Sequence, residues 1–244
     1  MNSPILIIGA TGNVGSELVR LLHNAGHTVR AAVVSDADAA QLPDGVTWVH
    51  FDFTNPETFA DAFANVKKMF LMRPPQISNV KRDMRPAIDY AAAVGMQHIV
   101  FLSLLGAERN RIVPHAKVEA LLQAGSVPYT LLRCGFFMQN LSTTHRQEIQ
   151  NNDEIFIPAG KGKTAFVDVR DIAAVAARVL TEPGNAQQAY QLTGAEALNY
   201  NEVAALMTQT WGRPIQNNNP HFLRFAWQLW RRGKPLRYVA GVSA

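Results

Sequence analysis

The sequence predicts an α/β fold: a doubly wound parallel sheet followed by a small C-terminal substrate-side region. Short apolar runs of strand length alternate with segments of helical periodicity, and strands that alternate with helices form parallel sheets. Three glycines stand between the first apolar run and the first helical segment. With 244 residues, of which 48% are hydrophobic, the chain can also bury a sizeable core.

The elements of the main sheet follow from these runs in chain order. The strands are expected at residues 5–8, 29–34, 48–51, 69–72, 98–102 and 129–132. The first helix, "VGSELVRLLHNAG", places its apolar residues on one face and ends at Gly26, an ordinary helix stop. Further helices are expected at residues 83–94 and 116–123.

After Leu132 the alternation changes. Two short extended pieces and a Gly-Lys-Gly turn precede a helix from about Val169, followed by a strand near 190–192 and helices near 201–211 and 221–231. We therefore expect a first domain over residues 1–150 and a smaller substrate-side region over residues 151–244, partly interleaved with the first.

The three glycines, Gly9, Gly12 and Gly15, have the spacing of a phosphate-binding turn. The first glycine permits the tight turn, the second lets the backbone approach a pyrophosphate, and the third lets helix and strand pack closely. The position between a strand and a helix favours dinucleotide binding over a purely structural turn.

The choice between NAD and NADP depends on the end of the second strand, where a carboxylate would accept from a ribose hydroxyl and an arginine would pair with a 2′-phosphate. Asp36 has nearly the spacing for NAD, but it could equally cap a short helix, and Arg30 lies too early. Asp52, after the third strand, could lie beside an adenine or form a turn. The preference stays open.

Four segments together resemble the NmrA-like family of atypical short-chain dehydrogenase/reductases: "GATGNVG", "FLSLLGA", "HAKVEALLQAGSVPYTLLRCGFFMQNL" and "FVDVRDIAAVAARVL". The resemblance implies a Rossmann fold with a small C-terminal substrate region and an NAD(P)H cofactor along the strand ends. Members of the family include NAD(P)H-dependent quinone oxidoreductases and catalytically silent redox sensors that regulate partner proteins.

The resemblance also implies site residues by position. The pyrophosphate loop would be Gly9, Thr11, Gly12, Asn13, Val14 and Gly15. The adenine would be flanked by Asp52 and Phe53, and the ribose by Leu71, Met72 and Arg73. The substrate pocket would include Phe136, Phe137 and Asn140, although two adjacent phenylalanines are more often part of a core.

The Tyr-x-x-x-Lys pair of ordinary short-chain dehydrogenases is absent, and His115 and Glu119 stand in its place, one helical turn apart. His115 could donate a proton or hydrogen bond to a quinone oxygen, or it could pair with Glu119 for structure. Ser103 stands where the superfamily keeps a substrate-orienting serine, or it simply closes a strand. Quinone reduction tolerates the missing pair because hydride donation to an electron-poor ring depends mainly on positioning.

Other classes are less favoured. No metal-ligand spacing and no Gly-x-Ser-x-Gly motif occur. No stretch resembles a signal peptide or membrane span, and the single cysteine, Cys134, is compatible with a reducing compartment; we expect a cytoplasmic protein. The net charge of +4 is mostly scattered, which does not favour a nucleic-acid partner.

The basic residues cluster only in the C-terminal stretch, where they alternate with Trp227 and Trp230; they are Arg224, Arg231, Arg232, Lys234 and Arg237. The helix there has an apolar stripe of Phe222, Phe225, Ala226, Leu229 and Trp230. Such a stripe packs as a lid or interface more often than on a membrane. Family members typically continue for a few tens of residues beyond the corresponding point, so we expect either a more open pocket, completion by a partner subunit such as a homodimer mate, or a shortened form.

Two hypotheses follow. The first is an NAD(P)H-binding oxidoreductase of the NmrA-like type that transfers hydride to a quinone or a similar electron-poor small molecule. The second is a catalytically silent NAD(P)-sensing protein that regulates a protein partner.

Overall fold

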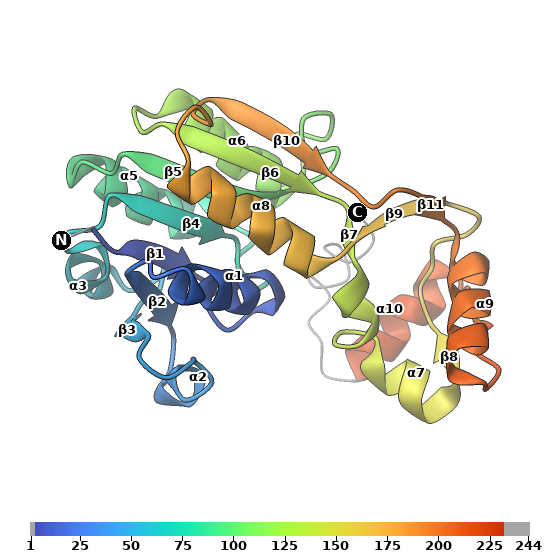
Figure 1. Ribbon diagram of the computed structural model, residues 1–244. Helices are drawn as coiled ribbons and strands as arrows, with labels where there is room; N and C mark the ends of the chain where they lie inside the picture. Colours follow the sequence, from blue (N-terminus) through green and yellow to red (C-terminus); the bar gives the residue numbers. More distant parts are fainter. Residues whose placement is uncertain (1–2, 232–244) are drawn as a thin grey trace. The chain divides into compact units, whose positions relative to one another are not determined.

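The structure, a computed structural model, describes residues 3–231 (Figure 1). Contacts divide the chain into two compact units. Unit 1 comprises Met1–Cys134 and Val169–Leu192, and unit 2 comprises Gly135–Asp168 and Thr193–Ala244. The boundary expected near residue 150 thus falls inside unit 2, and the chain returns to unit 1 before leaving it again. Within residues 3–231, no helix has the length and apolar character needed to cross a membrane.

Unit 1 is built on a seven-stranded sheet in the order β10-β6-β5-β4-β1-β2-β3, and every neighbouring pair is parallel. The order 3-2-1-4-5-6 within it is that of a dinucleotide-binding Rossmann sheet, and β10 extends the edge next to β6. The predicted fold class is confirmed. The strands are β1 (Ile5–Ile8), β2 (Val29–Val33), β3 (Thr47–His50), β4 (Lys68–Met72), β5 (His98–Leu104), β6 (Tyr129–Cys134) and β10 (Gln188–Leu192).

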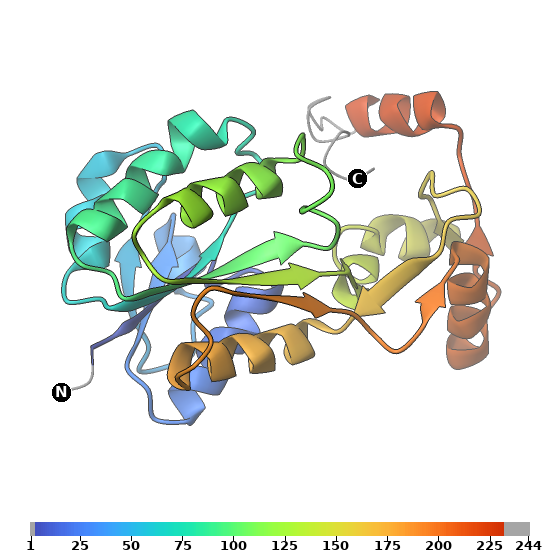
Figure 2. The same ribbon diagram turned by 90° about the horizontal axis from the view of Figure 1, so that it is seen from above.

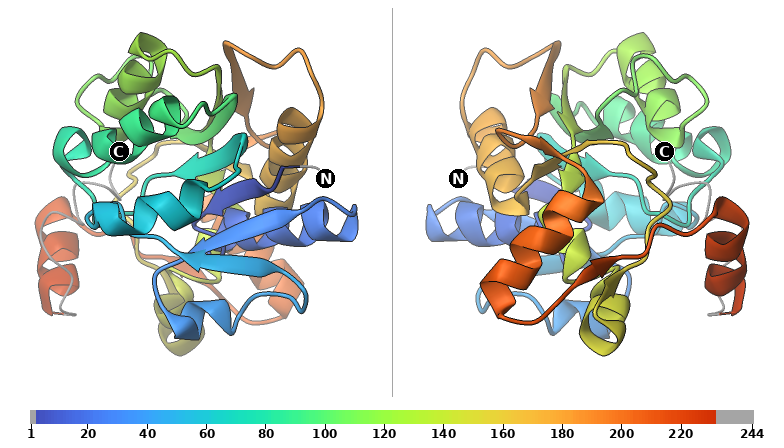
Figure 3. Two further views of the ribbon diagram at one scale, coloured as in Figure 1. Left: turned by 90° about the vertical axis from the view of Figure 1, so that its left-hand side faces the viewer. Right: turned by 90° about the vertical axis from the view of Figure 1, so that its right-hand side faces the viewer.

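Helices cover both faces of this sheet (Figures 2 and 3). One face carries α1 (Asn13–Asn24) and α8 (Val169–Thr181), which pack against each other. The other face carries α3 (Phe59–Phe63), α5 (Arg85–Ala93) and α6 (Pro114–Ala124). The central strands β1, β4 and β5 are almost entirely buried, as expected of a parallel sheet covered on both faces. Shorter helical segments are α2 (Asp36–Ala39), η1 (Pro56–Thr58) and α4 (Val80–Asp83).

The helix expected over residues 83–94 is wrong in its first part. The structure has two helices, α4 and α5, separated at Met84. Pro86 lies in the first turn of α5, where its missing N–H costs nothing. Proline has no N–H to donate to the carbonyl four residues earlier, that of Arg82 in α4, so α4 cannot continue through it, and a new helix starts at Arg85.

Unit 2 contains a three-stranded sheet in the order β11-β9-β7 and a parallel pair, β12 and β8. Its core packs Ile149, Ile155, Phe166 and Tyr200 together. Helix α7 of this unit was not predicted from the sequence. The elements are β7 (Phe136–Phe137), η2 (Met138–Leu141), α7 (Arg146–Asn152), β8 (Glu154–Ile155), β9 (Thr164–Val167), β11 (Ala197–Leu198), α9 (Tyr200–Trp211), β12 (Gln216–Asn217) and α10 (Phe222–Arg231).

Helix α10 packs on unit 2 through Phe225 and Ala226. Phe225 is buried, with its ring 6.0 Å from that of Phe156. From the expected apolar stripe, Phe222 and Trp230 are exposed. The side chain of Leu229 and the basic residues Arg232, Lys234 and Arg237 lie outside the described part of the chain.

Candidate functional site

The glycine loop leads from β1 directly into α1. Gly9 has a φ of +76°, a left-handed conformation that strongly favours glycine. The backbone N–H of Gly12 donates to the Gly9 carbonyl at 3.0 Å. This bond closes the turn, and α1 begins at the next residue, Asn13.

The three glycines differ in what an added side chain would meet. A Cβ on Gly9 would lie 2.6 Å from Cγ of Met72, and one on Gly15 would overlap the carbonyl oxygen of Gly9. A Cβ on Gly12 would meet only that same oxygen, at 3.3 Å, and would otherwise project into open space. Gly9 and Gly15 are therefore fixed by the packing of the loop itself, whereas Gly12 keeps an exposed surface free of side chains.

That exposed surface fits a pyrophosphate. Gly12 is the N-cap of α1 and has no side chain with which to cap the first turn, and an anion at a helix N-terminus interacts favourably with the backbone N–H groups and the helix dipole. The loop lies at the carboxyl end of β1, between β4 and β2 in the sheet. Strand order reverses at this point, and open α/β sheets bind their ligands at such reversals. Thr11 and Asn13 are half-buried beside it, whereas Val14 is buried and supports the helix.

Asp36 is the first residue of α2 and does not cap it. Ser35 is the N-cap, and its hydroxyl oxygen accepts from the backbone N–H of Asp38 at 3.2 Å. The helix-capping interpretation of Asp36 is therefore wrong. Its side chain is 87% exposed and lies 3.3 Å from Nε2 of His50, which leaves the carboxylate accessible to a hydroxyl donor.

Arg30 is engaged elsewhere. Its Nη1 donates to the carbonyl oxygens of Asp61, Ala62 and Ala64, at 3.2, 3.3 and 2.5 Å. The guanidinium thus caps carbonyl groups at the C-terminal end of α3, and these hydrogen bonds hold it there.

The two residues expected beside an adenine have different environments. Asp52 forms a turn, because its Oδ1 accepts from the backbone N–H and hydroxyl of Thr54 at 2.7 and 2.8 Å. Phe53 is buried in the core, with its ring 4.9 Å from that of Phe51. The ring of Phe53 is therefore part of the core and is not available to a ligand.

The residues at the end of β4 also differ in access. Leu71 is fully buried in the core, and Met72 is half-buried beside Gly9. Arg73 follows the strand, and its guanidinium folds against the loop that begins at Pro74.

His115, in the first turn of α6, lies near the positive charge of Arg73. Burial, and secondarily that charge, lowers the pKa of His115 to about 4. Its ring lies 6.2 Å from that of Phe101. At neutral pH the imidazole is therefore uncharged, so it can donate one hydrogen bond but carries no proton that is readily transferred.

The expected pairing of His115 with Glu119 is wrong. Glu119 is buried and forms two hydrogen bonds with Arg133, from Nε at 3.1 Å and from Nη2 at 2.7 Å. Ser103 is also buried, and its hydroxyl donates to the same carboxylate at 2.5 Å. A bidentate guanidinium partner neutralises the carboxylate better than a neutral imidazole does. Arg133 was not among the residues predicted for the site; its signal in the sequence is a charge within the mostly apolar strand β6.

The residues proposed for the substrate pocket belong to unit 2. The Phe136 ring packs 5.5 Å from that of Phe166 and 6.4 Å from that of Tyr200, so it contributes to the core of that unit. Phe137 and Asn140 are half-buried. Neither unit by itself brings Phe136, Phe137 and Asn140 together with the glycine loop.

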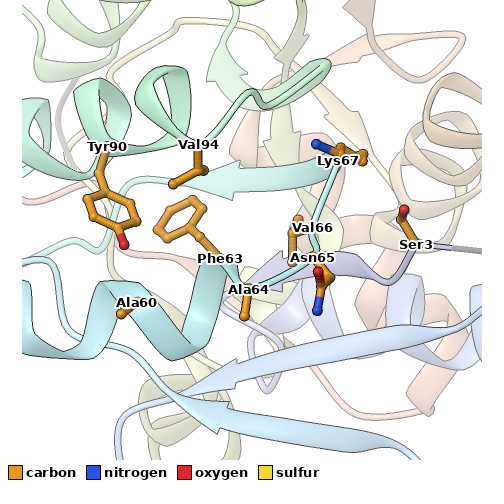
Figure 4. A pocket seen from close by; sticks show the side chains of 9 residues that line it. All are labelled: Ser3, Ala60, Phe63, Ala64, Asn65, Val66, Lys67, Tyr90 and Val94. Atoms are coloured by element: carbon orange, nitrogen blue, oxygen red, sulfur yellow. The ribbon is translucent and has the colours of Figure 1, made fainter.

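A separate shallow pocket of about 350 Å³ lies in unit 1 (Figure 4). Phe63 and Val94 lie between Tyr90 at one end and Lys67 and Ser3 toward the other. Lys67 directly precedes β4, so the pocket lies at the amino ends of the strands, whereas ligands of such sheets bind at the carboxyl ends. Within the described chain, no group of three or more His, Cys, Asp or Glu side chains could hold a metal ion.

The chain belongs to the NmrA-like family, which it matches over residues 1–221. It is 38% identical over 218 residues to an NAD(P)H azoreductase from Xenophilus azovorans, covering 87% of this chain and 75% of that protein. An NADPH-dependent quinone oxidoreductase from Escherichia coli, solved with NADPH, superposes with a TM-score of 0.84 at 28% identity, covering 98% of this chain and 86% of that chain. A Citrobacter triphenylmethane reductase, solved with NADP(H), gives a TM-score of 0.82 at 25% identity, with 98% and 87% coverage.

Proposed function

We propose that this protein is an NAD(P)H-dependent oxidoreductase that reduces a quinone or a similar electron-poor small molecule, such as an azo or triphenylmethane dye. The observation that carries the proposal is the glycine loop at the strand-order reversal, with an exposed surface at Gly12 that only a residue without a side chain leaves open. The relatives named above, an azoreductase, a quinone oxidoreductase and a dye reductase, support the choice of acceptor.

The chain's own residues would divide the work as follows. Gly9, Gly12 and Gly15 would hold the pyrophosphate at the start of α1, and the exposed carboxylate of Asp36 would accept from a ribose hydroxyl. When bound, the dinucleotide supplies a hydride equivalent, chemistry that no side chain offers. The protein then has to position the acceptor and exclude competing reactions.

His115 has a limited role in this scheme. With a pKa of about 4, it is neutral at the pH of most cells. A neutral imidazole can orient an acceptor by donating a hydrogen bond but is a poor general acid there. We therefore propose that His115 positions the acceptor and does not supply a proton to it.

The test is a single-turnover fluorescence experiment. NADH and NADPH are each mixed with equimolar protein and then with a panel of quinones and azo dyes, against protein-free controls. Rapid, protein-dependent loss of NADH or NADPH fluorescence would support the proposal. The cofactor whose fluorescence is lost faster would be the preferred one. Failure of both cofactors to bind would overturn it.

The same experiment bears on the sensor hypothesis. Binding of a cofactor without turnover of any acceptor would favour a protein that senses NAD(P) and acts through a protein partner. A pull-down repeated with NADPH, NADP and NAD would then show whether the set of partners depends on the cofactor. The buried thiol of Cys134 is compatible with the cytoplasm as the location of either activity.

A further inference from the structure

Arg73 uses one side of its guanidinium to hold the loop that follows β4. Its Nη1 donates to the carbonyl oxygens of Pro74 at 2.9 Å, Pro75 at 3.2 Å and Ile77 at 2.7 Å. These bonds fix the guanidinium relative to the end of β4. Arg73 directly follows β4, which neighbours β1 in the sheet, so its backbone lies at the carboxyl edge where strand order reverses.

The other edge of the same guanidinium has no protein partner among residues 3–231. Nε of Arg73 is buried and makes no hydrogen bond, and Nη2 makes none either. Nε and Nη2 form the fork that binds planar oxygen groups with two parallel hydrogen bonds. A buried charged donor without a partner is costly, and burial lowers the pKa of Arg73. A ligand oxygen at this edge would remove that cost.

The groups around Arg73 make it the local cation. His115 is uncharged at neutral pH, as described above. The buried carboxylate of Glu119 is satisfied by Arg133 and Ser103 and does not neutralise Arg73. The positive charge of Arg73 is thus left to act on a bound ligand.

We propose, on the basis of the function proposed above, that the Nε–Nη2 edge of Arg73 binds the acceptor oxygen on which negative charge accumulates during reduction. Transfer of a hydride would break one C–H bond of the reduced dinucleotide, leaving it oxidised, and form one bond to hydrogen on the quinone, leaving the hydroquinone monoanion. A proton from water then completes the hydroquinone. Preorganised donors aimed at developing charge are usually the largest contributors to catalysis, and Arg73 is such a donor.

The proposal predicts a preference for oxyanions that can be measured without turnover. The probe is 4-nitrophenol, whose anion absorbs visible light and whose neutral form does not. Titrated against the protein with saturating NADP or NAD, the bound probe should ionise more readily than the free one, with its apparent pKa lowered by about one unit, equivalent to tenfold tighter binding of the anion.

Two substitutions separate the charge from the fork. Arg73→Gln should abolish the shift of the probe's pKa, and Arg73→Lys should reduce it, because lysine keeps the charge but cannot present two parallel donors. The control is Arg178→Gln, which removes an exposed arginine paired with Glu182 and should keep the full shift. Because Nη1 supports a loop, each variant is first compared with wild type by thermal unfolding. If Arg73→Gln does not fold, the probe's pKa shift in Arg73→Lys decides whether the inference holds.

Turnover gives a second readout. Both Arg73 variants should lower kcat for quinones by about 10- to 100-fold. Absence of a pKa shift in the wild-type protein, or an equal shift in the Arg73 variants, would overturn the inference. A wild-type protein that shifts the probe through Arg73 but reduces no acceptor would instead refute the proposed function and leave the oxyanion-binding edge established.

Discussion

Arg133 and Glu119 form a two-point ion pair between β6 and α6, with Nη2 of the arginine 2.7 Å from Oε2 of the carboxylate. The side chain of Glu119 is 5% exposed and that of Arg133 is 14% exposed. A second carboxylate, Glu108, lies 3.6 Å from Nη1 of the same arginine. The pair therefore ties the helix that carries His115 to the sheet below it.

Removing Arg133 alone should strongly destabilise the protein. Arg133→Met leaves the buried carboxylate of Glu119 with only the Ser103 hydroxyl, and breaking a buried pair in this way costs about 3 kcal/mol of unfolding free energy. Equilibrium urea unfolding measures the change. The double variant Arg133→Met with Glu119→Gln should recover part of the loss, because no unpaired charge remains. A double variant less stable than Arg133→Met would contradict this account.

Gly12→Val should abolish cofactor binding with little effect on folding. The backbone of Gly12 has a φ of −78° and a ψ of 171°, which valine adopts readily, and the new side chain would occupy the surface proposed for the pyrophosphate. Affinity for NAD(P)H should fall by at least about 100-fold, measured by fluorescence titration. Retained affinity would show that the cofactor binds elsewhere.

A matched control for that experiment lies at the end of α6. Gly125 has nearly the same backbone conformation, with φ −83° and ψ 175°. A Cβ there would meet the carbonyl oxygen of Leu121 at 3.3 Å, the same distance as at Gly12, and that of Leu122 at 3.5 Å, an ordinary contact. Gly125→Val should therefore have a similar small effect on thermal stability and leave cofactor affinity unchanged.

The low pKa of His115 predicts a pH-dependent stability. Its pKa is about 4 in the folded protein and 6.5 as the ordinary value, so the unfolded chain binds the proton more readily between these values. Stability from this group is fully present above pH 6.5 and is lost as the pH falls toward 4, at no more than about 1.4 kcal/mol per pH unit.

The check is urea unfolding at several pH values between 4 and 7. His98 and His145 also have pKa values lowered mainly by burial, so they contribute with the same sign to the wild-type slope. His115→Gln should make the slope shallower without abolishing it. Parallel curves for the variant and wild type would show that His115 titrates normally.

The thiol of Cys134 should be unreactive in the native protein. Cys134 is buried, and burial raises its pKa to about 12, so the reactive thiolate is scarce and shielded. Reaction with a chromogenic disulfide reagent at neutral pH should be slow in buffer and fast in denaturant. A native rate close to that of a free thiol would show that the end of β6 opens readily.

Much of unit 1 was predictable because local pattern and tertiary structure agree there. The runs at 5–8 and 69–72 are apolar throughout, as strands buried on both faces must be, and the glycine spacing located the turn between strand and helix. The split between α4 and α5 was also encoded locally, by Pro86, but the helical periodicity on both sides concealed it.

The partners of side chains were less predictable, because they depend on which elements the fold brings together. A spacing of four residues on a helix made His115 and Glu119 natural partners, yet Arg133, from a strand, takes the carboxylate. The free edge of Arg73 could not be foreseen for the same reason: its other edge is occupied by carbonyl oxygens of a loop without regular structure.

The return of the chain to unit 1 at Val169–Leu192 constrains the order in which the protein can mature on the ribosome. Until that segment emerges, α1 lacks its packing partner α8, and β6 is an unprotected sheet edge because β10 has not yet paired with it. Uncovered strand edges invite aggregation. Synthesis of residues 135–168 therefore prolongs a vulnerable stage, and translation products that stop before Leu192 should be the ones that chaperones retain.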